Sequence, residues 1–277
     1  MVPPLPLGAY GLRLRGVGAA ERLLVEAEDS WPRYELVQEV SEEREAGEHV
    51  GADRAVLKLR SGGEIVIERV DGRIVYAVRH RLSDEELVHP YLAPAAAVIG
   101  RWLGRESFHG GAFVASGRVW ALLGERGSGK SSTLAWLALH GHDVVCDDML
   151  ILRDRTAFLG PRSVDLRADA ANELGAGEPL GVIGARERWR LLLGRPKAVP
   201  PLGGWVVLDW GRRLGAEKLS VAERVAQLVQ HRGLRIPSND PVAVIELAAL
   251  PGWTVRRPRG WESVAPAVQH LLEVLAG

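Results

Sequence analysis

The sequence predicts an α/β protein made of a small, mainly antiparallel β domain at the N-terminus and a larger core of strands and helices. Two observations predict this. Up to about residue 82, short segments alternate polar and apolar side chains and are separated by turn residues, which is typical of antiparallel strands that bury one face. From about residue 105, strand-like and helix-like segments alternate along the chain, which indicates an α/β core.

The N-terminal domain, residues 1–82, is expected to consist of short strands joined by turns. Asp71-Gly72 favours a tight hairpin turn between the last two strands. Residues 41–48 are acidic and polar, so we expect a loop there. The predicted strands are 10–15, 55–60, 63–68 and 73–78.

A helix over residues 83–104 is expected to link the two parts. Ser83 and Glu86 form the sequence pattern of a capping box, in which the two side chains satisfy backbone N–H groups at a helix start. We expect this helix to kink near Pro90 or Pro94, because proline cannot donate a helical hydrogen bond.

The core is predicted to span residues 105–277. Ser220 begins a second capping box, which opens a helix to about His231, and Asp240 is expected to cap another helix. A late strand over 253–256 and a closing helix over 264–275 complete the core.

The composition excludes several classes of protein. The chain has 277 residues, of which 47% are apolar, enough for one substantial core and a small accessory domain. Its formal net charge is zero, which argues against a nucleic-acid partner. The single cysteine, Cys146, rules out an intramolecular disulfide and suits a reducing cytoplasm. No signal peptide and no apolar run of membrane-spanning length is visible, so we expect a cytoplasmic protein with no membrane partner.

Residues 124–131 match the phosphate-binding pattern G-x-x-x-x-G-K-[ST] at every fixed position. The glycines allow a tight turn that points successive N–H groups into one concavity, Lys130 offers a cation to the β- and γ-phosphates, and Ser131 offers a hydroxyl to Mg²⁺. An apolar strand, 119–123, precedes the loop and a helix, 132–139, follows it, which argues against a chance glycine-rich turn. We expect nucleotide binding by Gly124, Glu125, Arg126, Gly127, Ser128, Gly129, Lys130, Ser131 and Ser132.

Two adjacent carboxylates, Asp147 and Asp148, separate two apolar strands. Neighbouring carboxylates repel each other, and a divalent cation relieves that repulsion. The carboxylate that does not bind the cation is able to accept a hydroxyl proton. The first strand follows the phosphate loop by one helix, so we expect its end to lie on the loop's side of the sheet. The alternative is a solvated turn, in which aspartate is common.

If the loop binds a nucleotide whose phosphate is transferred, a cation is also needed near the transferring group. Residues 186–190 carry three arginines that alternate along a predicted strand, with Arg188 as the candidate. The alternative is a solvated basic edge strand. A charged surface turn is a better explanation than a substrate contact for the late arginines Arg256, Arg257 and Arg259. His109 precedes the loop by fifteen residues, and a lone histidine is more often structural.

Taken together, these motifs resemble the catalytic domain of the HPr serine kinase/phosphorylase family, most closely the HPr-kinase-like enzymes of peptide biosynthetic clusters, including lasso-peptide kinases. The resemblance is carried by Phe108-His109-Gly110-Gly111, by 124–131 and by His140-Gly141-His142-Asp143 followed by Asp147-Asp148. It covers roughly residues 92–275 and implies a P-loop, HPr-kinase-like core.

The resemblance implies an ATP-dependent kinase that uses Mg²⁺ and phosphorylates a serine-type hydroxyl of a peptide or small protein. It implies that one carboxylate of Asp147 and Asp148 acts on that hydroxyl while the other helps to bind the metal. It also implies that His109 sits beside the γ-phosphate, that Asp165 is metal-linked, and that the protein forms a homo-oligomer. The chain lacks the glycine-rich signature that follows the catalytic strand in true HPr kinases, so HPr itself is not implied as the substrate.

Two other functions remain open from the sequence. A P-loop ATPase or nucleotide-gated switch without a phosphoacceptor would explain the phosphate loop, although it has less need of the paired aspartates. A nucleotide-binding scaffold, with the N-terminal domain as the working part, would not need Lys130 and the aspartate pair.

Overall fold

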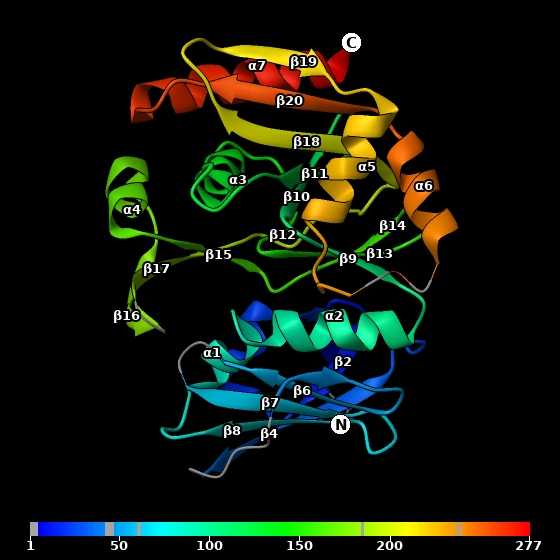
Figure 1. Cartoon of the computed structure of the whole chain (residues 1–277). Helices are drawn as coiled ribbons and strands as arrows, with labels where there is room; N and C mark the ends of the chain where they lie inside the picture. Colours follow the sequence, from blue (N-terminus) through cyan, green and yellow to red (C-terminus); the bar gives the residue numbers. More distant parts are fainter. Residues whose placement is uncertain (1–4, 42–46, 60–61, 184–185, 237, 239) are drawn as a thin grey trace.

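The computed structural model describes residues 5–41, 47–59, 62–183, 186–236, 238 and 240–277. The N-terminal strands form one sheet at one end of the molecule, two helices lie across it, and the remaining strands and helices stack beyond them (Figure 1). Most of the predicted loop over 41–48 lies outside the described residues.

The N-terminal sheet has eight strands in the order β3-β1-β2-β4-β8-β7-β6-β5. The pairs β2–β4 and β4–β8 are parallel, and the other neighbours are antiparallel. The strands are β1 (Leu7–Ala9), β2 (Leu12–Arg15), β3 (Val25–Glu26), β4 (Arg33–Val40), β5 (His49–Val50), β6 (Arg54–Lys58), β7 (Gly63–Glu68) and β8 (Arg73–Val78), with the 3-10 helix η1 (Gly18–Leu23) between β2 and β3.

The predicted hairpin 63–78 is confirmed with its bounds, and Gly72 has a φ of 61° in its turn. The predicted strand 10–15 is wrong in its first two residues. Tyr10 and Gly11 have φ values of 57° and 73° and form the turn between β1 and β2, so the strand begins only at Leu12.

The predicted linking helix is two helices. The capping box of Ser83 and Glu86 is confirmed and opens α1 (Asp84–Val88). The residue before a proline disfavours helical backbone, and His89, which precedes Pro90, is extended with φ −148° and ψ 118°. The chain resumes as α2 (Leu92–Trp102), which Pro94 does not interrupt because it lies in the first turn. This break turns His89 out of the helix.

The largest sheet of the core has six strands in the order β12-β10-β11-β18-β20-β19. β11, β18 and β20 are parallel, and β10 is antiparallel to both β11 and β12. β12 therefore runs in the same direction as β11, and both strands end at the same edge of the sheet. The strands are β10 (Gly111–Ala115), β11 (Arg118–Leu123), β12 (Val144–Cys146), β18 (Leu202–Trp210), β19 (Gly215–Lys218) and β20 (Gly252–Arg257).

Helices cover both faces of this sheet (Figure 1). On one face, α3 (Lys130–Leu139) and α7 (Val264–Ala276) pack on Phe113, Leu122 and Val206. On the other, α5 (Val221–Gln230) and α6 (Pro241–Ala249) pack near Trp205. The caps predicted at Ser220 and Asp240 are confirmed, and the 3-10 helix η2 (Trp261–Ser263) precedes α7.

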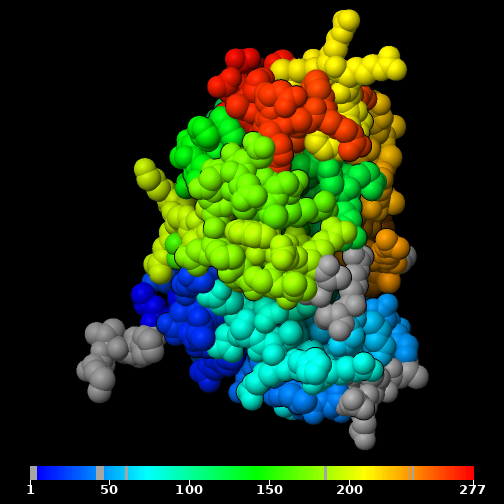
Figure 2. Space-filling model, turned by 90° about the vertical axis from the view of Figure 1, so that its left-hand side faces the viewer, coloured from blue at the N-terminus to red at the C-terminus, as the bar shows by residue number. Residues whose placement is uncertain are grey.

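Two three-stranded sheets complete the core. The first has the order β14-β13-β9, and the second β15-β17-β16. Figure 2 shows the second sheet and α4 forming the side of the molecule between the N-terminal strands and the C-terminal helix. The elements are β9 (Glu106–His109), β13 (Met149–Arg153), β14 (Thr156–Phe158), β15 (Ser163–Leu166), α4 (Ala168–Leu174), β16 (Glu178–Ile183) and β17 (Arg186–Leu192).

Candidate functional site

The glycine loop, residues 124–131, joins β11 to α3 at the edge where the parallel strands end. Gly124, Gly127 and Gly129 have φ values of 141°, 86° and 94°, which only glycine adopts without strain. A Cβ on Gly124 would lie 2.6 Å from the carbonyl oxygen of Leu208, so the loop also needs the missing side chain for space. The pattern of glycines is thus explained by the backbone conformation.

The loop holds polar groups that an anion would satisfy. Lys130 Nζ donates to the loop's own carbonyl oxygens, at 2.7 Å from Gly124 and 3.2 Å from Glu125. Burial lowers the pKa of Lys130, while the negative charges of Asp147, Asp148 and Glu125 oppose that shift. The Ser128 hydroxyl is buried and has no hydrogen-bond partner among the described residues.

The N-terminus of α3 lies in the same loop and has no side-chain cap. The first N–H groups of a helix have no partner within the helix, and the helix dipole adds positive potential there. Such a terminus favours phosphate. Ser132 is half-buried in this first turn, whereas Glu125 and Arg126 are exposed, which leaves Arg126 without a defined role in the site.

The aspartate pair lies directly beside this helix start. The Ser131 hydroxyl donates to the Asp147 carboxylate, with Oγ–Oδ distances of 3.3 and 3.2 Å. Asp147 is 2% exposed, and burial followed by the charge of Asp148 raises its pKa well above the usual range. The structure therefore brings the end of β12 to the glycine loop, as the direction of β12 predicts.

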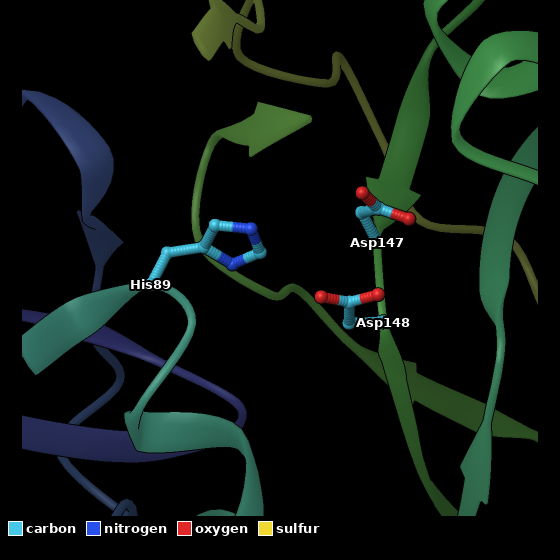
Figure 3. Close-up of side chains that lie close together, drawn as sticks. All are labelled: His89, Asp147 and Asp148. Atoms are coloured by element: carbon cyan, nitrogen blue, oxygen red, sulfur yellow. The ribbon is translucent and has the colours of Figure 1, made fainter. Parts of the chain in front are cut away.

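Asp148 occupies an uncommon backbone conformation, with a φ of 64°. Successive side chains of a strand point to opposite faces, and the left-handed turn at Asp148 interrupts that alternation. Both carboxylates consequently reach one place, where a His89 ring nitrogen and one oxygen from each carboxylate lie within 4.8 Å of one another. Figure 3 shows the imidazole extending toward the two carboxylates.

His89 comes from the break between α1 and α2, and Arg190 holds that break in place. Arg190 Nη2 donates to the His89 carbonyl oxygen at 2.8 Å, and its Nη1 lies 3.2 Å from the Glu85 carboxylate. Arg190 is 1% exposed. A buried guanidinium is tolerated only when its charge is paired, and Asp165 supplies the second partner.

Asp165, the third predicted metal ligand, lies beside this cluster but is engaged by Arg190. Its two oxygens accept from Arg190 at 2.8 and 3.0 Å, and Oδ2 lies 3.6 Å from His89 Nε2. Its role as a metal ligand stays a prediction. Arg188 lies two residues earlier in β17 and is half-buried, and its role toward the phosphoryl group likewise stays a prediction.

His109 ends β9 and is exposed. Its backbone N–H donates to the carbonyl oxygen of His231 at 2.6 Å, and that of the following Gly110 donates to the Asp148 carbonyl oxygen at 3.1 Å. His231 is buried, and burial, then the charges of Lys130 and His109, lower its pKa. His109 and His231 are thus neighbours of the glycine loop, on the side where Gln230 donates to the Glu125 carboxylate.

The interpretation of Arg257 as part of a surface turn is wrong, because its side chain is 6% exposed. A Cβ on Gly129 would lie 2.7 Å from Arg257 Nη2, so this guanidinium packs against the glycine loop. It donates to Ser263 Oγ at 2.8 Å, and its Cζ lies 4.4 Å from the centroid of the Trp210 ring. Arg256, in contrast, is at the surface and pairs with Glu217 and Asp209.

Sequence reasoning missed His89, Arg190 and Tyr10. The Tyr10 hydroxyl is buried without a hydrogen-bond partner in the described part of the chain. Its pKa is raised by burial and then by the charges of Cys146, Asp148 and Asp147, so Tyr10 lies near the aspartate pair. His89 and Tyr10 are far from the other motifs in sequence, and no local pattern marks them. Arg190 belongs to the predicted segment of three arginines, but only its burial in the structure distinguishes it from Arg188.

No family model matches the chain, and no curated protein matches its sequence. Among solved structures, it is similar to the HPr(Ser) kinase/phosphatase from Coxiella burnetii, with 11% sequence identity over 61% of this chain and 99% of that chain and a TM-score of 0.27. A TM-score this low carries no argument about function. Within the described residues, no helix is both long and apolar enough to cross a membrane.

Proposed function

We propose that this protein is an HPr-kinase-like, ATP-dependent kinase that transfers the γ-phosphoryl group to a serine-type hydroxyl of a peptide or small protein. The observation that carries the proposal is the contact between Ser131 and Asp147. It joins a glycine loop with phosphate-binding character to a buried carboxylate. Phosphoryl transfer needs mainly positioning and electrostatic stabilisation, which these groups are suited to supply.

Each group has a role in this proposal. The N–H groups of the glycine loop and the start of α3 would bind the phosphates, and Lys130 would leave the loop carbonyls to reach the β- and γ-oxygens. Ser131 and Asp147 would hold Mg²⁺, whose charge offsets that of the phosphoryl oxygens. Asp148 would accept the proton of the attacking hydroxyl. His109 would lie beside the γ-phosphate.

The finer assignment rests on the motif resemblance. The order of the His-Gly, glycine-loop and Asp-Asp motifs supports a kinase of the type found in peptide biosynthetic clusters. We therefore propose that the phosphorylated substrate is a peptide that is tailored into a natural product. We also propose that the protein acts in the cytoplasm as a homo-oligomer. The intact mass of candidate peptides, incubated with the protein, ATP and Mg²⁺, tests it, with the gain of one phosphate as the expected result.

Lys130→Ala is the decisive variant, since it removes the cation without touching the aspartate pair. We expect loss of transfer by a factor of about 10² or more, because one preorganised charge on the transferring group is worth that much. Lys218→Ala is the matched control, because Lys218 is exposed in β19. Release of inorganic phosphate alone, across a broad panel of acceptors, would assign an ATPase or switch instead. Unchanged activity of Lys130→Ala would remove the glycine loop from the chemistry and favour the scaffold.

A further inference from the structure

The starting observation is the imidazole of His89. It is 1% exposed, and neither ring nitrogen has a hydrogen-bond partner among the described residues. The nearest ionic contact, Nε2 to Asp165 Oδ2 at 3.6 Å, is beyond hydrogen-bonding distance. Buried polar groups are nearly always satisfied, and one that is not calls for a missing partner such as an ion.

The ring is directed at the carboxylates of Asp147 and Asp148 (Figure 3), of which Asp147 also accepts a hydrogen bond from the Ser131 hydroxyl. One ring nitrogen of His89 and one carboxylate oxygen each of Asp147 and Asp148 lie within 4.8 Å of one another. Tetrahedral ligands about 2.0–2.2 Å from a zinc ion lie about 3.3–3.6 Å from one another. The three atoms, which already lie within 4.8 Å of one another, would therefore reach a common ion through rotation of their side chains.

We propose that His89, Asp147 and Asp148 bind a divalent transition-metal ion, for which Zn²⁺ is the probe, in preference to Mg²⁺. Imidazole suits transition ions such as zinc, whereas Mg²⁺ prefers oxygen ligands and keeps most of its water. The inference rests on the proposed kinase for the ion's role. This ion would bind without nucleotide and in addition to the Mg²⁺ that Ser131 and Asp147 would hold with ATP, and Asp148 would bind it through one oxygen, which leaves the other oxygen for the proton of the attacking hydroxyl.

Neighbouring groups favour three protein ligands rather than four. Arg190 engages both oxygens of Asp165 and neutralises its charge. The same guanidinium fixes the His89 carbonyl oxygen, which orients the segment that carries the ring. An ion with three protein ligands keeps open positions, and these are what a phosphate oxygen or a hydroxyl would need.

The test is calorimetric titration of the full-length, metal-stripped protein with Zn²⁺ and separately with Mg²⁺, in the absence of nucleotide. We expect one Zn²⁺ per chain, bound at least about tenfold more tightly than Mg²⁺. His89→Ala should weaken Zn²⁺ binding by about tenfold or more while changing Mg²⁺ binding little. His270→Ala is the control, since that histidine is half-exposed on α7. Equal Zn²⁺ affinity in His89→Ala and the unmodified protein overturns the proposal, as does a lack of preference over Mg²⁺.

A second pair of variants tests the carboxylate. Asp148→Asn keeps a residue type that tolerates positive φ and should also weaken Zn²⁺ binding. Asp154→Asn is its control, because Asp154 has a φ of 54° and lies in the exposed turn between β13 and β14. Lys130→Ala should keep Zn²⁺ binding whether or not it loses turnover, so failure of the metal site and failure of the kinase proposal are distinguishable.

Zinc-edge anomalous diffraction from crystals of the unmodified protein decides the question if His89→Ala does not fold. A peak about 2.0–2.1 Å from a ring nitrogen of His89 supports the proposal. A peak elsewhere, or none after soaking with Zn²⁺, overturns it.

Discussion

Asp148 illustrates how one backbone angle assembles a site. Its φ of 64° directs its carboxylate to the place that Asp147 also reaches. Asparagine and aspartate adopt this conformation more readily than most residues, because their short polar side chains bond locally. The sequence predicts the acidic pair and its position after a strand, but no rule of periodicity predicts that both side chains meet on one side.

Gly129 is the residue of the loop whose substitution is most informative. In Gly129→Ala, alanine would have to adopt a φ of 94°, and its Cβ would lie 2.7 Å from Arg257 Nη2. We expect nucleotide affinity to fall by about tenfold or more, because the strain, of order 1–3 kcal/mol, is relieved only by distorting the loop. Fluorescent-nucleotide titration measures it.

Gly117→Ala provides the control for Gly129→Ala. Gly117 has a φ of 67° in the turn between β10 and β11, and no atom lies within 4 Å of its added Cβ. It should lose about 1–2 kcal/mol of stability, the cost of a left-handed backbone for alanine, and keep nucleotide affinity. Equal nucleotide affinity in both variants would contradict the prediction.

His231 predicts a specific loss of stability in acid. Burial, Lys130 and His109 lower its pKa below the usual 6.5. The His231 imidazole therefore binds a proton less readily in the folded protein than in the unfolded chain. The free energy of unfolding consequently decreases as the pH falls from about 6.5 through the pKa of the folded protein. His231→Gln should lose less stability than the unmodified protein between pH 7.5 and pH 5.

Urea unfolding at the two pH values measures the difference in the free energy of unfolding. His140→Gln is the control, because His140 is exposed at the end of α3. The prediction fails if His231→Gln shows the same change with pH as the unmodified protein.

At the scale of elements, Arg190 connects three segments that are distant in sequence. It contacts Asp165 of β15, Glu85 of α1 and the carbonyl oxygen of His89. Arg190→Met should lower the free energy of unfolding by about 3–5 kcal/mol, because it leaves the buried Asp165 uncompensated. Chemical denaturation measures this loss.

A double variant isolates the charge pair. Asp165→Asn added to Arg190→Met should recover part of the lost stability, which a sum of independent effects would not. Arg188→Met on the same strand should cost less than about 1 kcal/mol. A loss in Arg188→Met as large as in Arg190→Met would contradict the assigned pairing. Loss of phosphoryl transfer in Arg188→Met without loss of stability would support its predicted catalytic role.

Elements with local signals were predictable. The capping boxes at Ser83 and Ser220 and the Asp71-Gly72 turn act through neighbours within a few residues, and the structure confirms them. The division of the linking helix was foreseen only as a kink. A proline either bends one helix or separates two helices, and the outcome depends on which groups bind the backbone at the break. Here Arg190 binds the His89 carbonyl oxygen between α1 and α2.

At the scale of the whole molecule, one hydrophobic cluster runs from the N-terminal sheet through α2 to the core. It includes Tyr76 of β8, Ile99 of α2 and Ile151 of β13. Residues on nearly every side of α2 are buried, so the helix lies between two layers (Figure 1). Arg105 adds hydrogen bonds to the carbonyl oxygens of Tyr10 and Gly11.

This shared core predicts a single cooperative unfolding transition rather than one for each predicted domain. Separating the two parts would expose α2 and the sheet beneath it at once. Scanning calorimetry should give equal calorimetric and van't Hoff enthalpies if unfolding is reversible. Two resolved transitions would contradict the prediction.

The long-range part of the site could not be predicted from the chain. The glycine loop and aspartate pair carry recognisable patterns, and the direction of β12 follows from general sheet topology. His89 and Tyr10 reach the site only because the N-terminal sheet and linker pack beneath it. Such packing depends on the summed burial of many side chains, which no short motif encodes.

The position of Cys146 offers a way to measure how often β12 separates from its sheet. It is the single cysteine, it immediately precedes Asp147, and its side chain is fully buried. Burial raises the pKa of its thiol, and the nearby carboxylates raise it further. Alkylating reagents attack the thiolate, so modification must await transient opening of β12. The rate of alkylation of the unmodified protein would then report how often that strand detaches, with no label introduced.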